Sequence, residues 1–586
     1  MPLKDSDITD WMSLIKLSEK EREEKQPSWP MLRKYFRGIQ WQKDDEENDV
    51  VIVNLTFSHV KVIVPSTYLR NPKIYFEPNK PTAVKRARLM SSIFNGDMQR
   101  MGLKATNKRI IQDVVLLGTG FSKTTYEIEN PAALEYPDDK EMVDQLVEDF
   151  HNVSLKSDVL EIPENGPRVV WVRPDDLTFS LGATDLSDLG FISHHVRKRL
   201  MAIKNDPYYK NTSDLQPTWI ANDSKRDSQY YSEGASRYVE MVDLYEVWDM
   251  DTGTFFTIAE GHGKALREKE DIPYPYGHPF DRLTFTTLDD QMWGLSEVEM
   301  CIPQYDELNR LRTQQSQHVK RFNRKYVILE NSFADEEEKN NLTSGEDGTI
   351  VTVRASVGNV ANAVMALQDA PMTGDIYRYN TLIEDDVVKI AGITPYRRGG
   401  ISGANTATEA NIAEANSQTR DGDRRDYVSE FVLKQMAKVR KARREFTPGV
   451  AIANITDNPM DAPEWEQWRR SDIDLEMEMR IDYASTLPID DNTKRQNALL
   501  LYDRALANPT VNPQSAFSAL LDAFDERDQP KWFLPSELIK LQLLQKMMGA
   551  AQDQKGISPT APVGGGEPGP KTIETSAELE GRAATR

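Results

Sequence analysis

Residues 295–329 read LSEVEMCIPQYDELNRLRTQQSQHVKRFNRKYVIL, and this stretch decides the fold. Its one proline, Pro303, comes early, where a helix start or a kink tolerates it. The stretch therefore predicts a helix of about 30 residues, roughly 45 Å long. A second helix is predicted over 375–392, where a glycine suits the helix terminus. Two long helices thus bracket a short mixed segment, 327–370, in which TIVTVR (349–354) predicts a strand.

The chain after the second helix is predicted to be a loop followed by more helix. Residues 393–415, ITPYRRGGISGANTATEANIAEA, contain three glycines that deny the segment regular structure. Helix resumes over 423–446, and a strand-like segment (475–486) and a helix-rich region (491–550) follow. The apolar stripe of the helix consists of Val428, Val432, Met436 and Val439. From 551 onwards Gly and Pro supply ten of 36 residues, so a disordered tail is predicted.

The N-terminal half mixes helical and strand patterns. Residues 1–30 are dominated by charged side chains and predict an exposed segment, mostly helical. The further predicted helices precede Lys73, cover 83–117 and 139–153, and lie near Ile203. The predicted strands lie near 73–76, at 121–129, at 169–179 and in a hairpin at 238–261 that turns at 251–253. These patterns predict an α+β, helix-rich fold.

Composition narrows the class of protein. A chain of 586 residues predicts about three to four domains, or one large body with helical extensions. The formal charge of -21 argues against a protein that coats nucleic acid through its overall field, so any DNA contact must be local. The single cysteine, Cys301, rules out an intrachain disulfide and fits a reducing compartment. The polar N-terminus and the lack of long apolar runs predict neither a signal peptide nor a membrane span.

Two familiar enzyme motifs fail on inspection. GTGFSKT (118–124) lacks the glycines that a phosphate loop needs around its Lys-Thr pair, and a strand is expected next. Gly263–Lys264 is followed by alanine instead of Ser or Thr. Histidines 194 and 195 are adjacent, which is wrong for two ligands on one helix face. Acidic runs such as 336–338 are typical of solvated surfaces, although Mg²⁺ binding by a nuclease stays an alternative.

A basic cluster stands out in this acidic chain. Between Asn309 and Tyr326 the chain has six cationic residues and no acidic residue. The cluster consists of Arg310, Arg312, Lys320, Arg321, Arg324 and Lys325. A solvated helix face accounts for the pattern, and so does a surface that meets phosphates or an acidic partner. Arg397 and Arg398 offer a second positive spot.

The order of these elements resembles the portal proteins of tailed bacteriophages. YFRGIQW (35–41) is similar to the Tyr-x-x-Gly-x-Gln-Trp opening of many portals, and residues 54–78 are similar to the segment that follows it. VRPDDL (172–177) is similar to the Pro-Asp segment of portals. The resemblance therefore begins within the first predicted helices.

The resemblance continues through the two long helices. GLSEVE (294–299) is similar to the start of the portal stem helix, and SGANTATEA (402–410) is similar to the stretch after the second stem helix. The similarity runs over roughly 30–450. No single motif is specific, and the case depends on their order and spacing.

The resemblance implies a ring of about twelve copies at one capsid vertex, around a channel for double-stranded DNA. The implied parts are an N-terminal segment (1–30), a wing (31–293 and 413–490), a first stem helix (294–326), a clip (327–372), a second stem helix (373–393), a channel loop (394–412), crown helices (491–550) and the tail (551–586). An interface that closes into a ring makes one loop into a collar of identical loops.

The resemblance also implies roles for particular residues. The channel loop is expected to touch DNA through Arg397, Arg398, Asn405, Thr406, Thr408 and Glu409. The clip, with Glu336, Glu337 and Glu338, is expected to bind the terminase large subunit and later the head-tail adaptor proteins. Other expected partners are the major capsid and scaffold proteins. No catalytic residue, metal, cofactor or membrane contact is expected, and the protein is placed in the virion after assembly in the host cytoplasm.

Two other classes stay open at this point. A metal-dependent nucleic-acid-processing enzyme would need convergent carboxylates and a metal. Another capsid structural or scaffold protein would have long heptad helices and little β-structure, which the strand patterns at 169–179 and 238–261 oppose.

Overall fold

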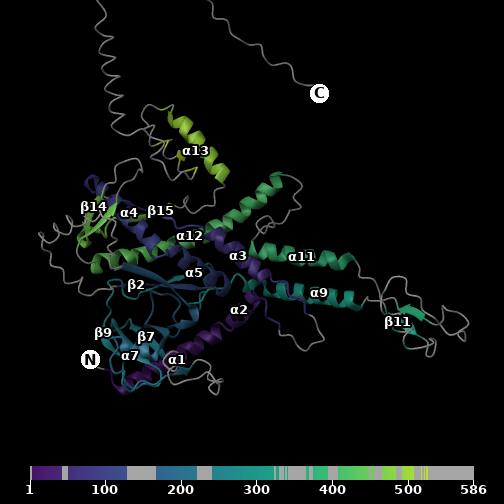
Figure 1. The fold of residues 1–586 in the computed structure, drawn as a ribbon, viewed down its shortest axis with the longest axis horizontal. Coiled ribbons are helices and arrows are strands. Elements are labelled where there is room, and N and C mark those ends of the chain that lie inside the picture. The colour runs from purple at the N-terminus through teal and green to yellow at the C-terminus, as the bar shows by residue number, and fades with distance from the viewer. Residues whose placement is uncertain are drawn as a thin grey trace, which may run out of the picture. The chain divides into compact units, whose positions relative to one another are not determined.

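The structure, a computed structural model, describes most of the chain up to residue 524 (Figure 1). The described residues are 3–41, 50–78, 80–127, 166–220, 240–321, 325–328, 336, 340, 364–367, 374–392, 407–447, 450–454, 465–482, 491–506, 508, 516–517, 520–521 and 523–524. The chain divides into two compact units, each described by itself. One comprises Met1–Thr456 and Pro463–Ile489, and the other comprises Asp457–Ala462 and Asp490–Arg586.

The larger sheet of the first unit has six antiparallel strands. Its strands are, in spatial order, β4 (Leu177–Phe179), β5 (Phe191–Arg199), β7 (Glu240–Asp249), β8 (Thr254–Ala259) and β9 (Arg267–Asp271), with β6 (Trp219–Ile220) also paired to β7. Because strand side chains alternate, Tyr245 and Val247 pack on one face of β7 while Leu244 packs in a separate cluster on the other. The predicted hairpin at 238–261 is confirmed by the pairing of β7 with β8.

The N-terminal segment is helical, as predicted, and helix α1 (Asp5–Lys25) packs one side on this sheet instead of being exposed all round. Ile8 and Ile15 are buried in one cluster with strand residues of β7 and β8. The ring of Trp11 makes edge contacts with Phe191 and Phe256. Most residues of the segment are charged or polar, but a narrow apolar stripe runs along one side of the helix. This stripe is enough to pack the helix on the sheet.

A second, three-stranded sheet lies against two long helices. Its order is β10 (Phe280–Leu283), β2 (Gly120–Glu127) and β3 (Gly166–Val172), all antiparallel. Helices α5 (Leu103–Leu117) and α12 (Ala407–Phe446) both contact all three strands. The predicted stripe of α12 is buried, as expected from its spacing. This layer forms the core of the unit together with the neighbouring helices.

Helix α12 is longer than the sequence predicted. It begins at Ala407, so residues 407–412 of the predicted channel loop are helical, and that part of the prediction is wrong. The physical reason is local, because the chain from 407 to 421 has no glycine or proline and several alanines and glutamates. The run predicted to be helical over 83–117 is divided into two helices at Gly102, which has a φ of +61°.

The two helices that decide the fold are both present. Helix α9 (Ile302–Arg321) has 20 residues, fewer than the 30 predicted, because a 3-10 turn at Glu299–Cys301 precedes it and the last residues of the predicted helix form a strand from Lys325. Helix α11 (Gly374–Ala391) ends at Gly392, whose φ is +68°, as predicted. Between them, β11 (Lys325–Ile328) pairs with β12 (Val364–Leu367). The predicted strand at 349–354 lies outside the described residues, as does the predicted helix at 139–153.

The remaining elements complete the first unit. They are α2 (Trp29–Arg37), α3 (Leu55–Thr67), β1 (Lys73–Glu77), η1 (Pro81–Ala83), α4 (Val84–Arg100), η3 (Pro174–Asp176), α7 (Leu200–Asn205), β13 (Val450–Asn454), β14 (Trp465–Arg469), η9 (Arg470–Asp472) and β15 (Glu478–Asp482). Strand β1 pairs with β15, far along the chain. The second unit contains α13 (Asp491–Leu506), and the predicted tail lies outside the described residues.

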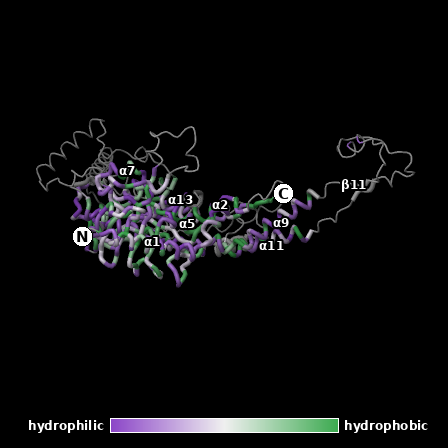
Figure 2. Tube along the Cα trace, turned by 90° about the horizontal axis from the view of Figure 1, so that it is seen from below, coloured by the Kyte–Doolittle hydropathy of each residue, from purple (hydrophilic) through white to green (hydrophobic). Residues whose placement is uncertain are grey.

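Along the described trace, hydrophilic and hydrophobic positions alternate at short intervals (Figure 2). No helix in the described part of the chain is both long and apolar enough to cross a membrane.

Gly294 provides a test of this packing, because its backbone lies against the end of α5. A Cβ atom at this position would lie 2.6 Å from the carbonyl oxygen of Gly118, and the hydroxyl of Thr284 is closer still. We expect Gly294→Ala to lower the free energy of unfolding by about 1–3 kcal/mol. Gly96→Ala, inside α4 where a Cβ atom would lie 4.0 Å from Arg100 Nη2 without a clash, should instead raise this free energy by roughly 0.5–1 kcal/mol. Thermal unfolding of both variants measures the difference, and equal stabilities would contradict the tight packing at Gly294.

Candidate functional site

The predicted site residues lie mostly at the far end of α9 and in the segments that follow it. Arg310 and Arg312 are exposed on α9. Lys320 and Arg321 belong to the last turn of α9, and Lys325 begins β11. Glu336 is exposed. Thr408 and Glu409 belong to the first turn of α12, and the residues outside the described part are Arg324, Glu337, Glu338, Arg397, Arg398, Asn405 and Thr406.

Helices α9 and α11 lie side by side, and β11 and β12 connect their far ends (Figure 1). The hydroxyl of Tyr379 on α11 donates a hydrogen bond to the carboxylate of Glu307 on α9. This hydrogen bond raises the pKa of Tyr379 above its ordinary value. Ile383 and Val387 are buried one helical turn apart on α11. The two helices therefore form a pair with an apolar side and a polar cross-link.

The base of this pair is held by a buried arginine of α12. The Nε atom of Arg424 donates to Glu297 Oε1 at 2.8 Å, and Nη1 donates to Asp421 Oδ1 at 2.8 Å. Its Nη2 atom donates to the carbonyl oxygen of Ala391 at 3.3 Å. One guanidinium thus joins the segment before α9, the end of α11 and the middle of α12. Burial raises the pKa of Glu297, although the charge of Arg424 opposes that rise.

A second arginine of α12 caps α11. The Nη1 atom of Arg420 donates to the carbonyl oxygens of Lys389 and Ile390, at 3.3 and 3.1 Å. These belong to the last turn of a helix, whose carbonyl groups have no partner inside the helix. A Cβ atom on Gly392 would lie 2.6 Å from Arg420 Cδ, so the left-handed glycine leaves room for this cap. The end of α11 at Gly392 is therefore fixed to α12.

The segment that resembles the portal opening is fastened to α9. The hydroxyl of Tyr35, in α2, donates to the carboxylate of Asp306, and burial raises the pKa of this tyrosine. The Asn309 Oδ1 atom accepts the backbone N–H of Val53 at 2.8 Å. The ring of His59 lies 2.8 Å from the hydroxyl of Tyr305. Three polar contacts thus tie the N-terminal segment to the first half of α9.

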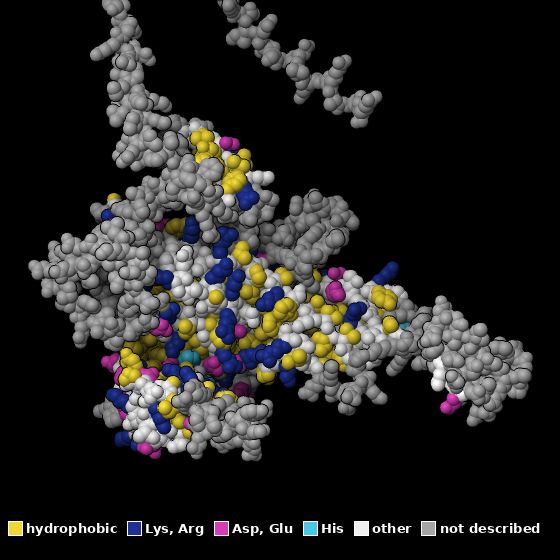
Figure 3. Space-filling model, in the orientation of Figure 1, with side chains coloured by type: hydrophobic (Ala, Val, Ile, Leu, Met, Phe, Trp, Pro, Cys, Tyr) yellow, Lys and Arg dark blue, Asp and Glu magenta, His cyan; other side chains and the backbone are white. Residues whose placement is uncertain are grey.

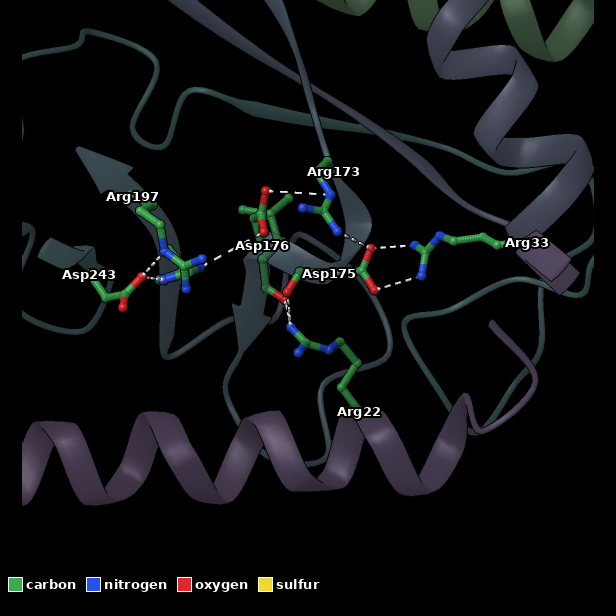
Figure 4. Close-up of polar contacts among 9 residues, drawn as sticks. Arg22, Arg33, Arg173, Asp175, Asp176, Arg197 and Asp243 are labelled. Carbon is green, nitrogen blue, oxygen red and sulfur yellow. Dashed lines mark hydrogen bonds and ion pairs between the residues drawn. The ribbon is translucent and has the colours of Figure 1, made fainter. Parts of the chain in front are cut away.

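The turn that resembles the portal Pro-Asp segment is the centre of a charged network (Figure 4). Arg33 of α2 makes two parallel hydrogen bonds to the carboxylate of Asp175, and Arg173 approaches the same carboxylate at 3.6 Å. Arg22 of α1 donates to the backbone oxygens of Asp175 and Leu177, at 2.5 and 2.9 Å. The turn therefore joins both N-terminal helices to the sheets.

His195 on β5 lies between two carboxylates of this network. Its Nδ1 atom lies 3.8 Å from Asp176 Oδ1, and its Nε2 atom lies 2.7 Å from Asp243 Oδ1. Asp176 and then Asp243 raise the pKa of His195, and together they outweigh the effect of burial. Arg197 also donates to Asp243, at 2.7 Å (Figure 4).

Sequence reasoning missed the Arg424 cluster, although a signal was present. Asp421 and Arg424 continue the spacing of the apolar stripe that starts at Val428, so they lie on its buried side. Charged residues in register with an apolar stripe need partners. The sequence left a metal-dependent enzyme as an alternative. In the described part of the chain, no group of three His, Cys, Asp or Glu side chains could hold a metal ion.

Removing the buried guanidinium should be costly. We expect Arg424→Met to lower the free energy of unfolding by about 3–5 kcal/mol, because it removes the buried cation that faces the carboxylate of Glu297. Lys389→Met is the matched control, since Lys389 and its partner Asp386 are both exposed, and it should change stability by less than about 1 kcal/mol. Chemical denaturation measures both variants. Similar losses for the two would refute a special role of Arg424.

The His195 contacts predict a pH dependence. Because the folded-state pKa of His195 is raised above 6.5, its stabilising effect is fully present below pH 6.5 and disappears as pH rises through the folded value. We expect His195→Gln to lower the melting temperature at acidic pH and to have a smaller effect at alkaline pH. His262→Gln, whose ring nitrogen lies 3.1 Å from a backbone oxygen, serves as control. A destabilisation by His195→Gln that does not vary with pH would argue against the contacts with Asp176 and Asp243.

One of three comparisons with known proteins agrees with the resemblance seen in the sequence. The search of curated proteins finds no match. A solved chain described as "Neck of empty GTA particle computed with C6 symmetry" is 11% identical, with 84% of this chain and 92% of that chain covered and a TM-score of 0.39. A family profile described as "Phage SU10 portal protein" matches residues 70–531, which is most of the chain. The chain therefore belongs to the phage SU10 portal protein family.

Proposed function

We propose that this protein forms the portal ring at one capsid vertex, through which a motor packages double-stranded DNA and through which the DNA later leaves. The family match over residues 70–531 carries this proposal. The α9–α11 pair supports it, because Arg424 anchors both helices to α12 at one end and β11 and β12 join them at the other. A rigid pair of this kind suits a repeated wall around an axis.

The parts of the chain receive roles within this proposal. The wing is assigned to 31–293 and 413–490, the stem to α9 and α11, the clip to 327–372 and the crown to 491–550. The channel loop is assigned to the residues between Gly392 and Ala407, since α12 begins at Ala407. Residues 336–338 of the clip are proposed to bind the terminase large subunit first and the head-tail adaptor proteins afterwards. Capsid and scaffold proteins are proposed to contact the wing.

The acidic net charge of the chain supports a channel that does not hold DNA tightly. The chain carries a formal charge of -21, and electrostatic attachment to phosphates requires local cations. Arg397 and Arg398 are therefore proposed to make weak, reversible contacts with the duplex as it passes. The remaining cations of the stem, Arg310 and Arg312 among them, are proposed to face a neighbouring copy or the duplex. No observation in the described residues favours a metal-dependent enzyme as a second function.

The test is assembly followed by packaging. We expect the purified full-length chain to give a ring of about twelve copies by native mass spectrometry, with a central hole in electron micrographs. Arg397→Ala with Arg398→Ala should leave the mass of the ring unchanged and alter the length or retention of the packaged genome. A chain that stays monomeric alone and with capsid and scaffold proteins would contradict the portal role. Unchanged genome length and retention would contradict only the role of the two arginines.

A further inference from the structure

Helices α2, α3 and α5 carry a group of cations that the portal channel does not explain. The three helices contact one another pairwise. From 55 to 109 the chain has eleven Lys or Arg residues and two acidic residues, a reversal of the overall sign of the protein. Six of the cations on these three helices have no ion-pair partner among the described residues. They are Lys34, Arg37, Lys61, Lys104, Lys108 and Arg109. In the space-filling view, Lys and Arg side chains gather over the region of these helices (Figure 3).

These six cations, here called the basic face, are accessible to solvent. Five are exposed and Lys108 is half-exposed. Among the described residues none of the six makes an ion pair, whereas nearby Arg33 binds Asp175 and Arg100 binds Asp97. Like charges gathered on one surface repel one another and lower stability. Binding of a polyanion to such a surface reduces this repulsion.

Two of the cations are held in place before any partner arrives. The guanidinium of Arg109 lies 3.4 Å from the centroid of the Trp171 ring. That ring is oriented by Asp113, whose Oδ2 atom accepts the indole N–H at 2.6 Å. The Nζ atom of Lys61 lies 5.6 Å from the centroid of Phe57. Such contacts reduce the side-chain entropy lost when a phosphate binds.

The chemistry of the basic face favours a phosphate backbone over an acidic protein. Four of its six cations are lysines, and lysine is depleted in protein–protein interfaces, whereas it binds phosphate as a point charge. A single-stranded nucleic acid would need a row of exposed aromatic rings for its bases. The face offers Phe57, which is 46% exposed, while Arg109 covers the ring of Trp171. The duplex form is therefore favoured.

We propose that the basic face of α2, α3 and α5 binds the phosphate backbone of double-stranded DNA without regard to sequence. This surface is separate from the proposed channel loop, and the inference does not depend on the loop touching DNA. The connection between α2 and α3 carries Asp44, Asp45, Glu46 and Glu47, whose charge opposes phosphate binding. Binding must therefore be measured on the full chain, where this opposing charge is present.

The experiment uses fluorescence anisotropy with a labelled duplex of about 30 base pairs, between roughly 50 and 200 mM salt. The test variant combines Lys61→Gln, Lys104→Gln and Lys108→Gln. The control variant combines Lys204→Gln, Lys210→Gln and Lys264→Gln, which are three exposed lysines of the large-sheet region, so both variants change the net charge equally. We expect the test variant to bind roughly tenfold more weakly or worse, and its salt slope to fall by about 2–3, since each phosphate contact contributes about 0.9.

Each outcome of this experiment has a definite meaning. Weaker binding and a smaller salt slope in the test variant alone support the proposal. Equal effects in both variants, or no binding by the natural chain, overturn it. Competition by polyglutamate as effective as by duplex DNA also overturns it, in favour of an acidic protein partner. Native mass spectrometry of the test variant keeps the two proposals apart, because loss of DNA binding with intact rings concerns the basic face alone.

Discussion

The guanidinium of Arg424 is the interaction on which the arrangement of the long helices depends. It donates to Glu297, Asp421 and the carbonyl oxygen of Ala391, and so connects three segments that are far apart in the sequence. Burying a charge in this way adds little net stability, because desolvation offsets most of the attraction. Its value is geometric, since any displacement of α11 or of the segment before α9 would leave a charge without a partner. The direction of the helix pair is therefore set by a polar contact within an apolar core.

Helix α12 makes further buried ion pairs along its length. Lys438 forms a 3.0 Å ion pair with Asp281 of β10, and Arg443 binds Asp97 of α4 at 2.7 Å. Burial raises the pKa of Asp281 and lowers the pKa of Lys438, so this pair is held in a poorly solvated place. Between these contacts the apolar stripe of α12 supplies most of the burial free energy. Helix α12 thus fixes the positions of the smaller sheet, α4, α11 and the base of α9 relative to one another.

The distribution of charge links the fold to its proposed work. An acidic chain repels DNA over most of its surface, so contacts with the duplex are restricted to places where cations gather. The basic face of α2, α3 and α5 is one such place, and it is built on rigid helices with Arg109 stacked on Trp171. The proposed channel loop is another, reached from the fixed end of α11 at Gly392. A protein of this kind can touch DNA at chosen points while the rest of its surface lets it move.

The sequence by itself determined the two helices, the glycine that ends α11, the β7–β8 hairpin and the stripe of α12, because these follow from spacing between near neighbours. It also indicated the family, through motifs that occur in the same order as in portal proteins. Only the tertiary structure decided that α1 is attached to a sheet, that Arg424 meets Glu297, and that α2, α3 and α5 contact one another. These contacts join positions far apart in the sequence, 127 residues in the case of Arg424 and Glu297. Local periodicity says which side of a helix is buried, whereas the partner on that side is chosen by the fold of the whole unit.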